Sequence, residues 1–422
     1  MGRLAIIIGI FDFSPGRALH LHHVLKSLNF QSIILTNRGI YIEQLPKPST
    51  NIVTINLRWI NYNNVLGRLL FYVFFAFLCF LKMFKYISTS REEQIFIIAR
   101  HPYPFSILSS LMVKWMNIKK NKRIRIIADV TDLWPESLFF MSGSFYVRIF
   151  VNIGMAINRW VYPKVDVIIT HNYPFKKYIE SVYLSGRTSI PIVIIPHLID
   201  LSEFKPINKD EALSMLEKMR CIVPEFKEKL RNRVVLGYVG LISKTIGSDI
   251  LLKLFEELKD DEKFVFFVVG EGPLKREMIH IAKSKNMNNV IFAGPFPHDL
   301  MKYVINVFDI ALVTSFQDPR HFSTRYCLPK KFVEYSACGK PIIYIGPSRV
   351  LSHYIKTYNS GYVVRNINVH SIKSILHEMS IKFHDLSKNS RKMAHCFSYE
   401  LARKKLSELF KLLYTIEEIT KK

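Results

Sequence analysis

The sequence predicts an α/β protein made of two Rossmann-like domains. Short apolar strands alternate with helices in both halves of the chain, and the alternation restarts after an irregular stretch at 196–232. Alternation of this kind indicates parallel sheets with right-handed crossovers. The chain has 422 residues, which suits two domains at roughly 100–200 residues each. We therefore expect a first domain over 1–200, a linker with a helical insertion over 201–232, and a second domain over 233–395.

The first half opens with an apolar strand at 4–10. This strand runs into a turn at Pro15 and Gly16 rather than into the small-residue cleavage site of a signal peptide. Later apolar runs predict strands at 32–35, 52–57, 94–99, 124–128, 166–170 and 192–195. Apolar residues at helical spacing predict helices at 18–28, 66–87, 106–115 and 145–160.

The second half repeats the pattern and ends in a long charged helix at 396–422. Strands are expected at 234–238, 264–269, 290–292, 310–314, 341–344 and 362–364. Helices are expected at 249–258, 274–285, 300–306 and 331–337. In sheets of this type, ligands bind beyond the carboxyl ends of the strands. The turns that follow the strands are therefore the first place to look for a binding site.

The composition gives information about partners and compartment. Lys and Arg number 59 against 34 Asp and Glu, a formal net charge of +25, which favours nucleic acid, an anionic membrane surface or phosphate-bearing substrates as partners. The sequence lacks a helix-turn-helix, a zinc knuckle and an aromatic–basic strand motif, so nucleic acid is not expected. The 5 cysteines form no C-x-x-C pair, which argues against a disulfide framework and favours a cytoplasmic protein.

One segment raises the question of a membrane. Residues 69–81 are 13 apolar residues in a row, preceded by Arg68 and followed by Lys82 and Lys85. A bilayer span needs about 20 residues, so an interfacial or monotopic helix, a buried core helix and a span all remain open. Basic residues nearby favour an anionic cytoplasmic leaflet, unless they form a solvated turn; these are Lys114, Lys119, Lys120, Lys122, Arg123 and Arg125. We expect a peripheral or monotopic protein on the inner face of the plasma membrane.

Three turns in the second half could bind a nucleotide. Residues 240–247 form a strand–helix turn, in which Gly240 frees the backbone and Lys244 adds positive charge beside a helix N-terminus. Gly272 belongs to a Gly-x-Gly turn, which is a weak signal by itself. Lys331 and Glu334 share a helix face, either as a surface ion pair or as ligands for a diphosphate and for ribose hydroxyls.

The order of these motifs resembles a known family. Residues 329–341 read PKKFVEYSACGKP, residues 269–274 read VGEGPL, and residues 308–312 read FDIAL. Together they resemble the C-terminal domain of family 4 of the retaining nucleotide-sugar glycosyltransferases. The DVTDLWP run at 129–135 is similar to an element of a bacterial and archaeal subgroup that makes cell-surface glycans, often on polyprenyl-linked acceptors.

The resemblance implies the GT-B architecture, in which two Rossmann-like domains face each other across a cleft and a C-terminal helix crosses back to the first domain. The second domain would hold the donor and the first domain the acceptor. Carried over by position, Glu334 would bind the ribose, Lys331 would face the diphosphate, and Asp132 would lie near the transferred sugar. The other donor-binding candidates are Gly16, Gly240, Lys244 and Gly272. Asp129 is an equally placed catalytic candidate, and either aspartate could instead cap the helix that starts near Leu133.

The implied reaction moves a sugar, with retention of configuration, from a nucleoside-diphosphate sugar to a glycan or polyprenyl-linked acceptor. The sequence contains no D-x-D pair suited to a divalent cation, and we expect neither a metal nor another cofactor. Two positions depart from the family pattern: Tyr326 stands where many members have Glu, and Ile246 where many have Lys. The alternatives are a non-catalytic, transferase-like scaffold subunit at the membrane and a nucleotide-sugar epimerase of the same fold.

Overall fold

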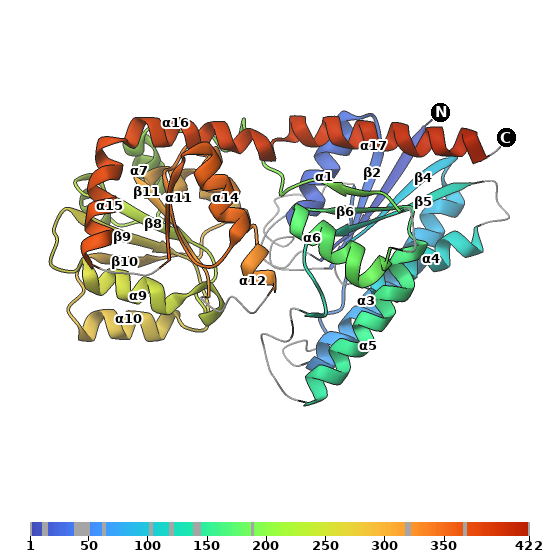
Figure 1. The fold of residues 1–422 in the computed structure, drawn as a ribbon, viewed down its shortest axis with the longest axis horizontal. Coiled ribbons are helices and arrows are strands. Elements are labelled where there is room, and N and C mark those ends of the chain that lie inside the picture. Colours follow the sequence, from blue (N-terminus) through green and yellow to red (C-terminus); the bar gives the residue numbers. More distant parts are fainter. Residues whose placement is uncertain are drawn as a thin grey trace. The chain divides into compact units, whose positions relative to one another are not determined.

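The computed structural model describes residues 2–10, 16–37, 51–60, 65–100, 104–117, 122–136, 138, 145–186, 190–316, 322–365 and 369–420. The chain divides into two units, one formed by residues 1–198 and 399–422 and the other by 199–398 (Figure 1). The first unit therefore contains both ends of the described chain. We refer to the two units as the first and second domains.

The first domain is built on a parallel sheet of 7 strands in the order β3-β2-β1-β4-β5-β6-β7. The strands are β1 (Arg3–Ile8), β2 (Gln31–Asn37), β3 (Ile52–Ile55), β4 (Gln94–Ala99), β5 (Arg123–Val130), β6 (Val167–Thr170) and β7 (Ile192–Ile194). β1 and β4 are rich in isoleucine and almost wholly buried, as expected for central strands covered on both faces. The strand order reverses between β1 and β4, and such a reversal opens a crevice at the carboxyl ends.

Helices cover both faces of this sheet. They are α1 (Gly16–Ser27), α3 (Val65–Thr89), α4 (Phe105–Met116), α5 (Phe145–Val161) and α6 (Tyr173–Tyr178). The last helix of the chain, α17 (Tyr399–Thr420), lies along α1 (Figure 1). Its apolar stripe joins the core of the first domain, where the Phe410 ring lies 4.7 Å from the Phe30 ring and 4.9 Å from the Phe96 ring. The expected return of the final helix to the first domain is confirmed.

The second domain contains a parallel sheet of 6 strands in the order β10-β9-β8-β11-β12-β13. The strands are β8 (Val234–Val239), β9 (Phe264–Val269), β10 (Val290–Ala293), β11 (Ile310–Thr314), β12 (Ile342–Ile345) and β13 (Gly361–Val364). The main helices are α9 (Ser248–Glu257), α10 (Lys275–Ser284), α11 (Met301–Val307), α12 (Phe322–Tyr326), α13 (Lys330–Ala337), α14 (Arg349–Tyr358), α15 (Val369–Ile381) and α16 (Phe383–Ala394). Here the strand order reverses between β8 and β11, the second crevice of this kind.

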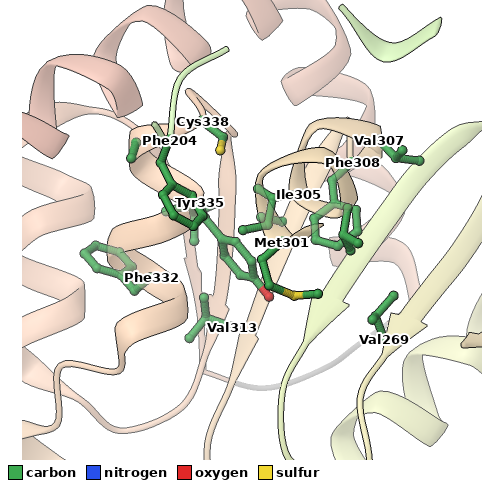
Figure 2. Close-up of a cluster of buried hydrophobic side chains, with 14 of the residues drawn as sticks. Phe204, Val269, Met301, Ile305, Val307, Phe308, Val313, Phe332, Tyr335 and Cys338 are labelled. Carbon is green, nitrogen blue, oxygen red and sulfur yellow. The ribbon is translucent and has the colours of Figure 1, made fainter. Parts of the chain in front are cut away.

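The segment expected as a linker, 201–232, belongs to the second domain, and the helical insertion expected within it is present. It forms α7 (Lys209–Lys218) and α8 (Pro224–Arg231). Phe204 is buried in the same core cluster as Tyr335 and Phe308 (Figure 2). The prolines and charges of the segment lie on its outer side, while its apolar side chains complete the core beside α11 and α13. The structure thus has two domains with no separate linker of that length.

Helix α3 combines two apolar faces. Every fourth residue along one face is buried in the first-domain core, namely Phe71, Phe75, Cys79, Met83 and Ile87. The other face exposes Leu70, Val73, Phe74, Phe77 and Leu81. By length and composition alone, the stretch 67–89 could cross a membrane, and 33% of its most apolar window is buried. One side of α3 is therefore held by the domain while the other meets solvent.

Much of the expected basic cluster is paired within the protein. Lys114 and Arg125 both bond Asp166, at 2.8 Å and 2.9 Å. The Lys122 ammonium donates to the carbonyls of Ile87 and Ser90. Lys119 and Lys120 lie outside the described residues. The paired cations hold neighbouring elements together, so the cluster as a whole is not a free basic surface.

Candidate donor-binding site

The strand-order reversal of the second domain is lined by glycine turns. Gly240 follows β8 with a φ of +133°, and a Cβ at this position would lie 2.9 Å from the Lys331 Nζ atom. A Cβ on Gly270 would lie 1.9 Å from the Gly240 carbonyl oxygen, and one on Gly272 would lie 2.2 Å from the Ile242 oxygen. The Gly-x-Gly turn therefore packs backbone to backbone against the 240–247 turn. Gly272 shapes the loop that carries Gly240.

Helix α13 brings Lys331 beneath this loop. The helix is almost entirely buried, and the Tyr335 hydroxyl accepts a 2.7 Å hydrogen bond from the Val239 N–H at the end of β8. The Lys331 ammonium is buried and has no hydrogen-bond partner among the described residues. It lies 3.8 Å from the centroid of the Tyr238 ring. A buried cation with this environment is poised to receive hydrogen-bond acceptors from a ligand.

Burial changes the acidity of Lys331. Desolvation lowers the pKa of its ammonium to about 7, although Glu334 and Cys327 act in the opposite direction. An anion placed against the ammonium would stabilise the charged form and raise this pKa again. The protonation of Lys331 and the binding of an anion are therefore coupled.

Glu334 is held by one partner on its own helix and by one from a distant turn. Its Oε1 atom lies 2.9 Å from His298 Nε2 and 3.4 Å from the Lys330 Nζ atom. Lys330 and His298 are also 2.9 Å apart, and the imidazole tautomer decides which contact is a hydrogen bond. Burial alone would raise the pKa of Glu334, but Lys330 and His298 hold it at about 2. The carboxylate is therefore ionised at neutral pH.

Of the two possibilities left open for Lys331 and Glu334, the structure does not form the surface ion pair between them. The direct ion pair of Glu334 is with Lys330, one turn away at the i,i+4 spacing, and not with Lys331. That spacing was visible in the sequence. His298 lies 36 residues earlier, in a 3-10 turn after β10 (His298–Leu300), and no local pattern could have joined it to Glu334.

Lys244 and the two departures from the family pattern have clear positions. Lys244 is exposed on the turn between Gly240 and Gly247, and its ammonium bonds to no other described residue. Ile246 packs at the edge of the core, and its carbonyl accepts a 2.6 Å hydrogen bond from the Thr314 hydroxyl. Tyr326, at the end of α12, packs against the core cluster around Tyr335. Apolar packing thus replaces a charged side chain at both positions.

The first domain separates the two aspartates that the sequence left equivalent. Asp129, at the end of β5, is fully buried, and both of its oxygens accept from Arg17 Nε, at 3.0 Å and 2.9 Å. Arg100 Nε adds a 2.7 Å bond. Burial opposes ionisation, but the two guanidinium groups hold the pKa of Asp129 below its usual value. Asp132 is exposed on the following loop.

Arg17 ties several segments of the first domain together. It directly follows Gly16, which begins α1 with a φ of +56°. Besides Asp129, its guanidinium donates to the carbonyls of Ile195 and Pro196. The N-terminus of α1 is therefore fixed to the ends of β5 and β7. The sequence pointed to Gly16 and Asp129 but gave no sign that Arg17 and Arg100 join them.

The comparisons with known proteins agree with this geometry. The model of the family described as "Glycosyl transferases group 1" matches residues 223–393. The glycosyltransferase MJ1069 of Methanocaldococcus jannaschii is 22% identical over 263 residues, which cover 61% of this chain and 59% of that protein. The chain thus matches about three-fifths of the length of that relative.

Solved structures match over nearly the whole chain. A sucrose-phosphate synthase from Thermosynechococcus elongatus superposes with a TM-score of 0.68 at 15% identity, covering 99% of this chain and 100% of that one. Anabaena HepE, in complex with UDP and glucose, gives 0.67 at 12% identity, covering 97% and 99%. WaaG, a glycosyltransferase involved in lipopolysaccharide biosynthesis, gives 0.63 at 14% identity, covering 95% and 98%.

These matches show the GT-B fold, and the family match lies in the second domain. That domain carries the glycosyltransferase group 1 match and contains the glycine turns, Lys331 and Glu334. The chain therefore has the GT-B fold, and residues 223–393 of its second domain match a glycosyltransferase family model.

Proposed function

We propose that the protein transfers a sugar, with retention of configuration, from a nucleoside-diphosphate sugar to a glycan or polyprenyl-linked acceptor at an anionic membrane surface. The observation that carries the proposal is the buried ammonium of Lys331 against the Gly240 turn, which has no hydrogen-bond partner in the described part of the chain. An uncompensated buried charge is costly, and a diphosphate would compensate it. Relatives of the same fold have been solved with UDP, glucose or UDP-glucose.

The donor would be held by groups of opposite charge on α13. Lys331 would meet the diphosphate, with exposed Lys244 and the backbone of the Gly240 turn on the same side. The ionised Glu334 would accept hydrogen bonds from the ribose hydroxyls, and Lys330 and His298 would keep its carboxylate in place. As the glycosidic bond breaks, charge grows on the leaving diphosphate. Preorganised cations stabilise that charge in the transition state, and we propose that no metal ion takes part.

The first domain would supply the acceptor side. We assign the role near the transferred sugar to Asp132, because its carboxyl is exposed at the carboxyl edge of the sheet. Asp129 is better suited to positioning, because its carboxylate is buried and forms ion pairs with Arg17 and Arg100. Gly16 would let the first turn approach the donor, as its left-handed backbone conformation is one that side chains disfavour.

Membrane association would use the exposed face of α3. Trp59 stands beside Phe74 on this face, with the ring centroids 5.3 Å apart. Helix α5 adds an exposed row of Phe145, Ile149 and Ile153. The Trp134 ring connects the two helices, since it contacts Tyr72 of α3 and Phe150 of α5. Apolar rows of this kind on a strongly basic protein suit the surface of an anionic cytoplasmic leaflet.

The test is a donor screen with purified protein. Binding of UDP-, GDP- and other nucleotide sugars would be measured by calorimetry, and release of nucleoside diphosphate would be measured with and without a polyprenyl-linked acceptor. We expect one nucleotide class to bind and Glu334→Gln to weaken it, because an amide accepts hydroxyl hydrogen bonds less strongly than a carboxylate. Glu256→Gln, on the exposed side of α9, is the matched control. The absence of binding by every nucleotide sugar would overturn the proposal and favour a scaffold subunit.

A further inference from the structure

Three strands of the first domain place polar residues in a row on one face of the sheet. Ile98, Ile127 and Ile169 lie in the same core cluster beneath α1. Arg100, Asp129 and His171 each follow two residues later, so their side chains leave the sheet on the same side. The strands pair directly, with Ala99 opposite Ala128 and Asp129 opposite Ile169. The row therefore lies at the carboxyl edge, where ligands of such sheets bind.

The charges in this row do not balance among the described residues. Asp129 is one carboxylate, and it is shared by the two guanidinium groups of Arg17 and Arg100. The side chains of Arg17 and Asp129 are 2% and 0% exposed, while that of Arg100 is 12% exposed. Guanidinium does not lose its proton in proteins. One positive charge is thus left over in a largely dry environment, where it calls for an anion.

The surplus charge can be traced to Arg100. Arg17 uses all three of its nitrogens, on Asp129, Ile195 and Pro196. Arg100 uses Nε on Asp129, and its two terminal nitrogens bond to no other described residue. The hydrogen bond from Nε to Asp129 fixes the orientation of the guanidinium plane. The edge that carries the two terminal nitrogens therefore points in a fixed direction. That edge offers the paired N–H groups that match a phosphate.

A second buried group in the row also lacks a partner. His171 is 2% exposed, and its Nδ1 atom has no hydrogen-bond partner among the described residues. Its ring stays neutral, because burial first and Arg17 second lower its pKa to about 3. A neutral imidazole can donate or accept one hydrogen bond at Nδ1. The unsatisfied nitrogen is independent of the charge imbalance and points to the same kind of polar ligand.

We propose that Arg100 binds a phosphate group of a substrate at this edge of the first domain, with Asp129 holding the guanidinium in place and His171 on the same face of the sheet, beyond β5. This proposal deepens the proposed function, on which it rests, by giving the acceptor side a phosphate site. The phosphate is either that of a phosphate-linked acceptor or that of the donor. Both sources share the anion chemistry that a fixed guanidinium fork recognises.

The test measures binding of inorganic pyrophosphate to the full chain, with and without saturating UDP. Arg100→Gln removes the positive charge but leaves Asp129 paired with Arg17. Arg100→Lys keeps the positive charge but lacks the paired N–H groups of the guanidinium. Arg91→Gln, at an exposed site before β4, is the matched control. We expect Arg100→Gln to weaken binding roughly 10-fold or more, Arg100→Lys to be intermediate, and the control to equal wild type. The unfolding midpoint of each variant checks that the fold is kept.

The UDP arm identifies the source of the phosphate. If the Arg100-dependent binding persists under saturating UDP, the site belongs to the acceptor; if UDP abolishes it, the site belongs to the donor. Equal pyrophosphate affinity in wild type and Arg100→Gln would overturn the proposal. This failure is distinct from failure of the proposed function, which is read from nucleotide-sugar binding and the Glu334→Gln variant in the second domain.

Discussion

Both domains bury a charged cluster at the carboxyl edge of a parallel sheet, but the two clusters use different cations. In the first domain, Arg17 and Arg100 clamp Asp129 in a network of short bonds. In the second, the Lys331 ammonium has no hydrogen-bond partner among the described residues. The guanidinium groups stay charged at any pH, whereas the pKa of Lys331 is about 7. The charges of the first cluster are therefore independent of pH, whereas the charge on Lys331 depends on pH and on what binds to it.

This difference separates stability from binding. A buried ion-pair network stabilises the domain only while its carboxylate is present, because removal of that carboxylate leaves the guanidinium groups buried without a counter-ion. An unsaturated buried ammonium costs stability in the free protein and recovers it when an anion binds. Substitutions in the two clusters should therefore have opposite effects on the free energy of unfolding.

The largest expected effect is on the stability of the first domain. Asp129→Asn leaves two buried guanidinium groups without a carboxylate, which should lower the free energy of unfolding by about 3–5 kcal/mol. Asp132→Asn, on the exposed loop three residues later, should change it by less than about 0.5 kcal/mol. The measurement is denaturant unfolding of both variants and wild type. Equal free energies of unfolding for the two variants would contradict the assignment of Asp129 to positioning and of Asp132 to contact with substrate.

A smaller effect should appear in the pH dependence of donor binding. Below about pH 7 the Lys331 ammonium is already charged in the free protein, so affinity should be constant. As pH rises above that value, binding must take up a proton, and affinity should fall by up to about tenfold per pH unit. Calorimetric titrations of an intact sugar nucleotide from about pH 6 to about pH 8.5 would measure this. In the Arg100→Gln variant, donor affinity should fall with rising pH as in wild type. In the Lys331→Met variant, donor affinity should no longer depend on pH in this range.

The smallest expected effect concerns membrane attachment. Leu81 of α3 and Leu412 of α17 are both 46% exposed, which makes them a matched pair. Leu81→Ser should reduce binding to vesicles containing anionic lipid severalfold, because the lost apolar contact is of order 1 kcal/mol. Leu412→Ser should have no effect on vesicle binding in a sedimentation assay. The same loss in both variants, or in neither, would remove α3 from the proposed membrane surface.

The sequence was sufficient for the elements that carry a strong local pattern. The isoleucine-rich strands, the glycine turns and the amphipathic helix α17 follow from periodicity and turn chemistry. The helix α7 was expected, but the packing of its segment into the second domain was missed, because prolines and charges suggest a linker locally while burial depends on distant neighbours. Local pattern also could not separate Asp129 from Asp132. Their difference comes from arginines that lie 112 and 29 residues away from Asp129 in the chain.

Within the candidate site, the sequence pointed to two residues of one helix but not to the partners that reach them from other elements. Lys331 and Glu334 share α13, so their spacing pointed to a common face. His298 reaches Glu334 from the turn after β10, and Tyr238 reaches Lys331 from β8. Such contacts depend on strand order, which the alternation of elements does not specify. The structure therefore adds the partners and the electrostatics of these residues, which spacing along one helix does not reveal.

The most direct test of the account is thermal unfolding of wild type and Lys331→Met, each with and without saturating sugar nucleotide. Removing the buried charge should stabilise the free protein by about 1–3 kcal/mol, which raises the midpoint by roughly 2–4 °C per kcal/mol. The same variant should lose most of the donor-induced increase in the midpoint, whereas Lys283→Met, at an exposed site on α10, should match wild type. A Lys331→Met protein that unfolds at a lower temperature and keeps the full donor-induced increase would contradict the account.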